Sequence, residues 1–238
     1  HLRPDNHGWS NGDQVTAGDF VWSWQRLLAP ATRAPQAPLL FDIVNAREIN
    51  SGALDPATLG AVAVDNWTLE VVLTTPMADF GAIVASPATV PAYQPAVEAF
   101  GAAWTEAATC VSNGPFRLAE WEHGVRLRLA PNPGHWLRES INVEAIVRPI
   151  TSAADQQERY AQGRLDVLPL SDAAAFTTAT DASIREQRRT ATVAATWLLV
   201  PNIGVPPFSD VAARQALSHL IDRERLVQLS RGQLTGAV

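Results

Sequence analysis

The feature of this sequence that most constrains its fold is a pair of neighbouring runs in which apolar and polar residues alternate. The second run, VRLRLA at 125–130, places its apolar side chains two residues apart, and this period predicts a strand with one buried face. The first run, FRLAEW at 116–121, largely follows the same period. Because the short segment 122–124 ends in glycine and separates the two runs, they are predicted to form a β-hairpin.

A helical pattern is found nearer the start of the chain, behind a tight turn. Asn11 and Gly12 both tolerate the positive φ that such a turn requires. Thr16 suits the N-cap of a helix, and Asp19, three residues on, extends the pattern to a weak capping box. The helix is predicted to end at Pro30. Its apolar residues recur at helical spacing and define one buried face: Phe20, Val21, Trp24, Leu27 and Leu28.

The rest of the chain mixes further strands and helices. A second hairpin is predicted around Asp65 and Asn66, and Pro76 closes it. Single strands are predicted at 142–150, 165–170 and 196–202. Helices are predicted from Thr151 or Ser152 to about Gln162, from Ser209 to about Ile221, and from Asp222 onward. This order indicates a mixed α+β or α/β protein.

Composition argues against several classes of function. The 24 acidic residues outnumber the 18 Lys and Arg, and the formal net charge of −6 argues against a nucleic-acid partner, because phosphate binding needs a surplus of cations. The sequence has no run of about 18 apolar residues that could span a bilayer. Cys110 is the only cysteine, so an internal disulfide and a zinc site of several cysteines are both excluded.

The sequence also lacks several motifs that mark common enzymes. It contains no H-E-x-x-H, no G-x-x-x-x-G-K-[ST] and no G-x-G-x-x-G. The five histidines are scattered, and none has a His or Cys partner three or four residues on, so no metal or cofactor is expected. Asp210 and Asp222 lie near helix starts, where capping is their expected role. These observations favour a binding protein over an enzyme.

Several segments, in order along nearly the whole chain, carry a resemblance to a known family. They are HLRPDNHGWSNGDQVTAGDFVWSWQRLLAP at 1–30, LGAVAVDNWTLEVVLTTP at 59–76, VSNGPFRLAEW at 111–121, NPGHW at 132–136, YAQGRLDV at 160–167 and PPFSDVAARQALSHLIDRERL at 206–226. Together they resemble the large extracellular peptide-binding proteins of ABC importers. This is the peptide/nickel-type family of solute-binding proteins, and its oligopeptide binders are the most similar in style.

The resemblance implies a periplasmic-binding-protein-like fold of type II. In that fold two α/β lobes joined by a hinge close around a ligand, and peptide binders add a third, smaller domain. By resemblance, 1–96 belongs to the extra domain, 97–196 to the first lobe and 197–238 to the start of the second lobe. The hinge is expected near 195–197. The resemblance covers the middle of the family's length, so the chain is expected to be a piece of a longer protein.

The resemblance also implies a function. Family members bind short peptides through the peptide backbone, as an added strand, and deliver them to an ABC permease in the membrane. The expected location is the periplasm or the outer face of the cell membrane, with any lipid anchor outside this chain. Two alternatives remain. One is a receptor of the same family for a metal chelate, haem or a sugar derivative, and the other is a hydrolase on an α+β fold.

Five candidate ligand-binding residues follow from the resemblance. Trp197 and Leu198 lie where the family crosses between its lobes, although Trp197 can equally be a core residue of a sheet. Leu170 and Ser171 follow a predicted strand in a loop that faces the cleft in relatives, although Ser171 also suits a plain surface loop. Gln36 stands where oligopeptide binders commonly carry an aromatic residue, which favours a different ligand contact there. The anchor for the peptide amino group is expected outside this chain.

The remaining aromatic residues are expected to be scaffold. Trp9, Trp24, Trp121 and Trp136 are predicted to fill the cores of their lobes, because tryptophan buries a large apolar area. A chain without most of the second lobe is expected to bind peptide weakly. It is also expected to expose an apolar face that favours self-association.

Overall fold

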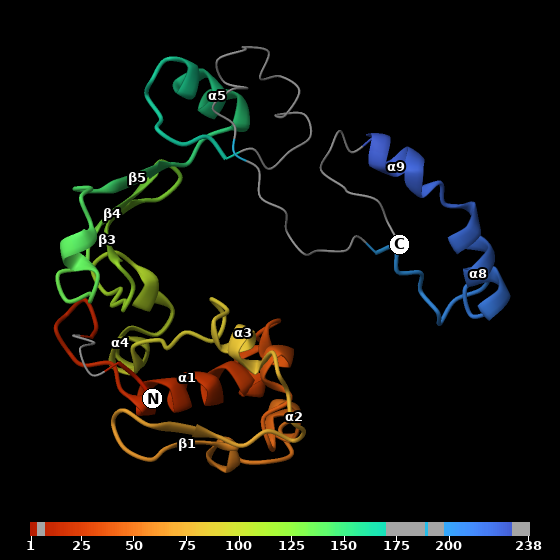
Figure 1. The fold of residues 1–238 in the computed structure, drawn as a ribbon, viewed down its shortest axis with the longest axis horizontal. Coiled ribbons are helices and arrows are strands. Elements are labelled where there is room, and N and C mark those ends of the chain that lie inside the picture. The colour runs from red at the N-terminus through yellow and green to blue at the C-terminus, as the bar shows by residue number, and fades with distance from the viewer. Residues whose placement is uncertain (4–7, 170–188, 190–197, 230–238) are drawn as a thin grey trace. The chain divides into compact units, whose positions relative to one another are not determined.

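A computed structural model describes residues 1–3, 8–169, 189 and 198–229 of the chain. The chain divides into two compact units, His1–Ile150 and Thr151–Val238 (Figure 1). The first unit contains two small antiparallel sheets with helices, whereas the described elements of the second unit are helical. None of the described helices has the length and apolar character needed to cross a membrane.

The first helix, α1, spans Ala17–Leu28, and its start confirms the predicted turn and capping box. The amide of Gly12 donates to the carbonyl of Trp9 over 2.9 Å, which closes the turn. Oδ2 of Asp19 accepts hydrogen bonds from both the amide of Thr16, at 2.7 Å, and its hydroxyl, at 3.0 Å. At the other end of α1, Pro30 begins a short 3-10 helix, η1, Pro30–Thr32. The α-helix therefore ends next to the proline, as the sequence predicted.

The core of the first unit lies against one face of α1. Trp24 and Leu28 of α1 are buried there. They pack with η2, Ala37–Leu40, with α2, Ala46–Ser51, with the short helix η3, Pro56–Thr58, and with the predicted hairpin of β1, Ala61–Ala63, and β2, Leu69–Val71. Four of the five residues predicted to face the core do so: Trp24 and Leu28 are buried in it, and Phe20 and Leu27 pack against it. Val21 is half-buried and lies outside this cluster.

Two polar side chains of α1 fasten a later segment to this core. Nε1 of Trp24 donates to the carbonyl of Thr89 over 2.8 Å. Oγ of Ser23 accepts from the amide of Ala92 over 2.8 Å. The segment follows α3, Phe80–Val84, and leads into α4, Gln94–Phe100, and η4, Gly101–Thr105. The indole of Trp24 therefore satisfies its buried donor with a backbone acceptor.

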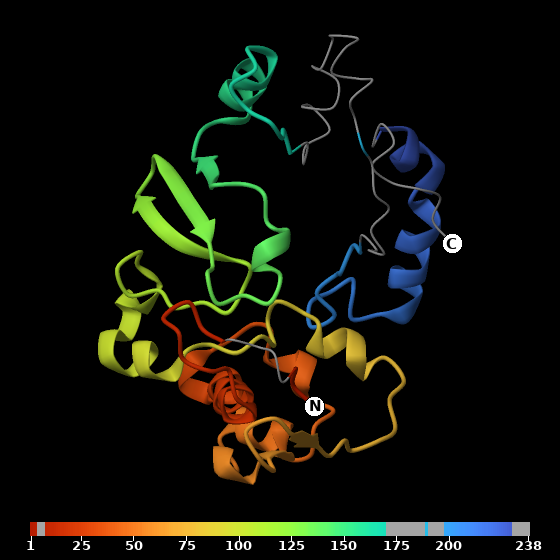
Figure 2. The same ribbon diagram turned by 60° about the vertical axis from the view of Figure 1, so that its left-hand side comes forward.

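The second sheet of this unit has the strand order β3-β4-β5, with all neighbours antiparallel (Figure 2). Strands β3, Phe116–Glu122, and β4, Arg126–Pro131, form the predicted hairpin. The strand predicted at 142–150 is confirmed over the shorter range of β5, Ile146–Pro149. A register shift lies between Leu118 and Glu120. Because it inserts one residue, Leu118 pairs with Leu129 and Trp121 with Leu127, so these side chains share one face.

The helices of the second unit are capped much as the sequence predicted. Helix α5, Ala153–Ala161, begins after Ser152, whose hydroxyl accepts from the amide of Asp155. Asp222 likewise caps α9, Arg223–Leu229. The predicted start of α8, Val211–Leu220, at Ser209 is wrong by one residue, whereas the capping role expected for Asp210 is confirmed. Asp210 is the N-cap and accepts from the amide of Ala212 over 2.8 Å, because its carboxylate reaches this orphan amide.

Two strand predictions and one core prediction are wrong. No strand forms over the described parts of the predicted strands, 165–169 and 198–202, where Val167 is 77% and Leu198 76% exposed. A strand needs a neighbour for its backbone groups, and the part of the chain that the structure describes supplies none at either stretch. Trp136 is 44% exposed and does not fill a core, whereas Trp9 and Trp24 are buried as predicted. Trp121 is half-buried.

Candidate ligand-binding site

Gln36 lies on an ordered turn between η1 and η2 of the first unit. Its carbonyl accepts from the amide of Leu39 at 3.0 Å, and the amide of Ala37 donates to the carbonyl of Ala34 at 3.1 Å. Both Ala37 and Leu40 are buried in the core, so the backbone that follows Gln36 is held there. The Gln36 side chain is exposed, and its carboxamide can both donate and accept hydrogen bonds.

The helix that precedes this turn is also held at its end. Nδ2 of Asn50, in α2, donates to the carbonyl of Leu28 over 3.0 Å, which satisfies one of the last free carbonyls of α1. Arg33 adopts a left-handed conformation, with φ of 49°, and this redirects the chain toward Gln36. The position of Gln36 is therefore set by the core and not by contacts of its own side chain.

The other predicted site residues belong to the second unit. Leu198 is the first residue of the described stretch 198–229, and its side chain is 76% exposed. Leu170, Ser171 and Trp197 lie outside the described residues. Gln36 and Leu198 are thus both exposed side chains, and they belong to different units.

A hollow in the first unit was missed at the sequence level. It has a volume of about 500 Å³ and is open to solvent. It lies between β3 and the connection from β4 to β5, which contains the short helix η5, Arg138–Ser140. Its lining residues are Arg117, Pro131, Pro133, Arg138, Ile141, Asn142, Val143 and Glu144. The sequence signal at this place, Asn132-Pro133-Gly134, predicts only the end of a strand.

Metal binding finds no support in the part of the chain that the structure describes. There, no group of three or more His, Cys, Asp or Glu side chains could hold a metal ion. The lone thiol of Cys110 is half-buried, and this burial raises its pKa above the usual range. A thiol with a raised pKa is a poorer nucleophile at neutral pH, because less of it is present as thiolate.

The fold and its relatives define the class of protein. The family model for the middle region of the bacterial extracellular solute-binding proteins, family 5, matches residues 1–237. The solved structure of OppA from Burkholderia pseudomallei superposes with a TM-score of 0.79 at 30% identity, over 94% of this chain and 44% of that one. The chain therefore has the periplasmic-binding-protein-like fold that the resemblance implied.

Curated relatives agree with this class. The periplasmic oligopeptide-binding protein OppA of Salmonella typhimurium is 34% identical over 98% of this chain and 43% of its own length. A probable deoxycholate-binding periplasmic protein of Escherichia coli, YgiS, is 30% identical over the whole chain and 44% of its own length. The chain thus spans less than half the length of these relatives. It belongs to the bacterial extracellular solute-binding proteins, family 5.

Proposed function

We propose that the protein captures short peptides in a cleft between two lobes and delivers them to a membrane permease of an ABC importer. The observation that carries the proposal is the match to the family over residues 1–237, together with the likeness to the Burkholderia pseudomallei OppA structure. Salmonella typhimurium OppA, whose name assigns it oligopeptide binding, supports the same ligand class.

The proposed mode of binding is main-chain recognition. A peptide that pairs with the protein as an added strand offers the same amide groups whatever its sequence, and hydrated pockets accept its side chains. Trp197 and Leu198 are proposed as a pocket wall at the crossing between lobes. Leu170 and Ser171 are proposed in a loop at the cleft, where the Ser171 hydroxyl bonds the ligand backbone. Gln36 offers a hydrogen-bonding carboxamide from its fixed turn.

The proposed domain division follows the family. Residues 1–96 form part of the extra domain of peptide binders, 97–196 part of the first lobe, and 197–238 the start of the second lobe. The hinge lies near 195–197. Closure about this hinge buries the ligand, so peptide affinity depends on both lobes, and these 238 residues alone bind peptide weakly.

The proposed role is transport and not catalysis. The family consists of solute-binding proteins, which supports a receptor without turnover. The proposed location is the periplasm or the outer face of the cell membrane, because the relatives' names place them in the periplasm. A lipid anchor, if the protein has one, lies outside this chain.

A second ligand class is favoured by two observations. Gln36 occupies the turn where the resemblance led us to expect an aromatic residue, so an aromatic stacking contact is absent there. YgiS, which is named for probable deoxycholate binding, is 30% identical over the whole chain. The alternative is therefore a receptor of the same family for an amphipathic solute that is not a peptide.

A chimera tests the proposal directly. The matched part of Salmonella typhimurium OppA is replaced by this chain, and the chimera is titrated with trilysine and trialanine by calorimetry, with deoxycholate in a parallel titration. Saturable binding of both peptides, with the peptides recovered intact, supports a peptide receptor. Peptide cleavage, or saturable binding of deoxycholate and of neither peptide, overturns it. OppA itself, carried through the same titrations, is the control for a functional cleft.

A further inference from the structure

The hollow beside β3 has a rigid floor. The buried side chain of Asn132 donates to the carbonyl of Gly114 at 2.9 Å and accepts from the amide of Gly134 at 3.1 Å. The backbone amide of Asn132 donates to the carbonyl of Pro115 at 2.9 Å. These bonds tie the end of β4 to the start of β3, so the two proline residues of the lining, Pro131 and Pro133, are held in place.

The wall formed by η5 is also ordered. The amide of Arg138 donates to the carbonyl of His135 at 2.8 Å, and the amide of Ile141 returns to the carbonyl of Arg138 at 3.2 Å. One guanidinium nitrogen of Arg138, Nη1, donates to the carbonyl of Ile141 at 3.3 Å. A guanidinium carries five N–H donors, so this bond leaves others free for a ligand.

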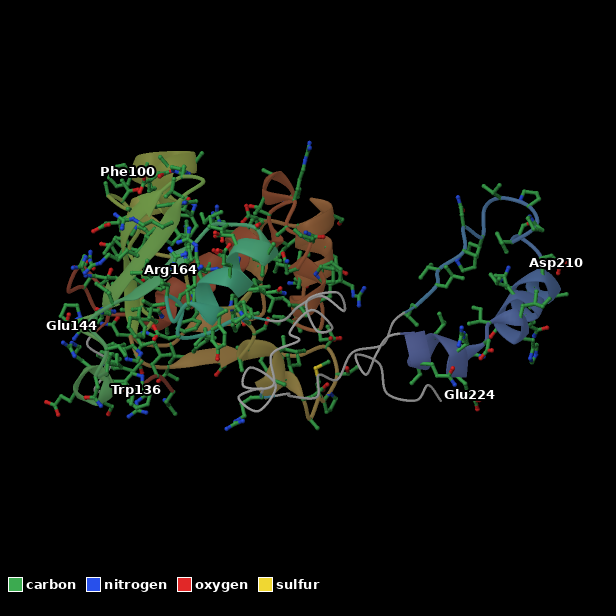
Figure 3. All side chains as sticks on the ribbon, turned by 90° about the horizontal axis from the view of Figure 1, so that it is seen from above. Phe100, Trp136, Glu144, Arg164, Asp210 and Glu224 are labelled. Atoms are coloured by element: carbon green, nitrogen blue, oxygen red, sulfur yellow. The ribbon has the colours of Figure 1, made fainter. Side chains whose placement is uncertain are left out.

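The charged side chains that line the hollow form no ion pairs among the described residues. Arg117 and Arg138 are cations, and Glu144 is the one acidic residue of the lining. None of these three takes part in an ion pair among the described residues, whereas neighbouring Arg126 and Arg128 are both paired with glutamates. Two guanidinium groups without an ion pair therefore line one hollow, on a chain whose net charge is −6. Glu144 is exposed, and Figure 3 shows it at the edge of the first unit.

We propose that this hollow binds a carboxylate that carries an apolar body. Arginine recognises carboxylates through paired N–H donors, and here two guanidinium groups line one volume. Pro131, Pro133, Ile141 and Val143 supply the apolar surface against which the body of the ligand packs. A volume of about 500 Å³ lies within the range of small-molecule sites, about 300–1,000 Å³, and far exceeds an inorganic anion.

The site is distinct from the proposed peptide cleft. Each of its lining residues lies between Arg117 and Glu144, and none is a candidate residue for peptide binding. The test therefore uses N-acetylleucine, which has a carboxylate and an isobutyl group and no free amino group. N-acetylleucine amide is the matched ligand without the charge, and inorganic phosphate is the anion without the apolar body.

Calorimetric titration of the 238-residue chain decides between a site and a bare surface. Saturable binding of N-acetylleucine, with the amide and phosphate each about tenfold weaker or undetectable, supports the proposal. The variants Arg117→Gln and Arg138→Gln each weaken binding about tenfold, because each removes a charge-assisted hydrogen bond. Arg148→Gln, which changes an exposed arginine of β5 outside the lining, leaves the affinity within about twofold.

Two results overturn the proposal. One is a wild-type chain, folded by circular dichroism, that shows no saturable heat with N-acetylleucine. The other is an equal affinity for N-acetylleucine in wild type, Arg117→Gln and Arg138→Gln. A parallel titration with 4-methylpentanoate identifies the source of the carboxylate. Equal affinity assigns the site to free carboxylic acids, and tighter binding of N-acetylleucine assigns it to acylated amino acids or peptide C-termini. Both assignments support the carboxylate site, whatever the outcome for the peptide cleft.

Discussion

The hydroxyl of Tyr93 donates a hydrogen bond to Oδ2 of Asp13, a residue 80 positions earlier in the sequence. Nδ2 of Asn11 donates to the same carboxylate oxygen at 2.8 Å. The ring of Tyr93 also packs against the buried indole of Trp9, with 5.3 Å between ring centroids. The turn that precedes α1 is thereby fastened to the segment that precedes α4. The bonds from Tyr93 and then Asn11 lower the pKa of Asp13 below its usual value of 3.8.

We predict that stability depends on pH through Asp13. A carboxyl whose pKa is lowered by folding stabilises the native state above its unfolded pKa, near 3.8, and this contribution is lost as the pH falls through the folded value. Tyr93→Phe should therefore be less stable than wild type at pH 7, and the difference should shrink below pH 3.8. Urea unfolding at pH 7 and at acid pH measures this. A pH-independent difference for Tyr93→Phe would contradict the account.

Trp24→Phe should destabilise the first unit strongly. The change leaves a cavity in the core and removes the donor that satisfies the carbonyl of Thr89, a combined loss of about 2–4 kcal/mol. Denaturant unfolding followed by circular dichroism gives the value. Trp136→Phe is the matched control, because Trp136 is 44% exposed. Its ring contacts are one with His135 and a cation–π interaction with Arg3, which is worth about 1 kcal/mol or less. Equal losses in the two variants would refute the assigned core.

Asn132→Ala should destabilise the turn that forms the floor of the hollow. The buried side chain of Asn132 bonds Gly114 and Gly134, so its removal leaves a part-buried carbonyl and a part-buried amide without this partner, at a cost of about 1–2 kcal/mol. Asn142→Ala, at an exposed position of the lining, should change the unfolding free energy by about 0.5 kcal/mol or less. Thermal or urea unfolding of both variants measures the contrast. An Asn132→Ala variant with an unchanged free energy of unfolding would show that the floor is not held as described.

Gln36→Tyr tests the candidate peptide site in the OppA chimera. If the turn faces a bound peptide, an aromatic ring there should strengthen binding by about 0.5–1.5 kcal/mol, which is roughly a 2- to 12-fold lower Kd. Calorimetry with trialanine and triphenylalanine measures this, and the gain should be larger for the aromatic peptide. The substitution should leave the unfolding free energy within about 0.5 kcal/mol, because Gln36 is exposed. An unchanged Kd for both peptides would remove Gln36 from the site.

Much of the local structure followed from the sequence. The turn at Asn11-Gly12, the capping box of Thr16 and Asp19, and the β3-β4 hairpin all form where their patterns predicted. Each depends on groups a few residues apart, so the information lies within one short segment. The resemblance carried by such segments was likewise sufficient to identify the family.

Contacts between distant segments could not be predicted in the same way. The apolar stretches 165–169 and 198–202 have the composition of strands and form none, because a strand depends on a neighbour that composition does not specify. The hollow was missed because Arg117 and Arg138 are brought together by the packing of a loop against β3.

Sequence alone established the elements, their caps and the family, because hydrophobic period, turn chemistry and capping act over a few residues. Folding in three dimensions settled which side chains meet, as in the bond between Tyr93 and Asp13 and in the hollow between β3 and η5. The physical reason is that pairing across long separations depends on the geometry of the packed elements, and this geometry arises from the sum of many weak contacts and from no single motif.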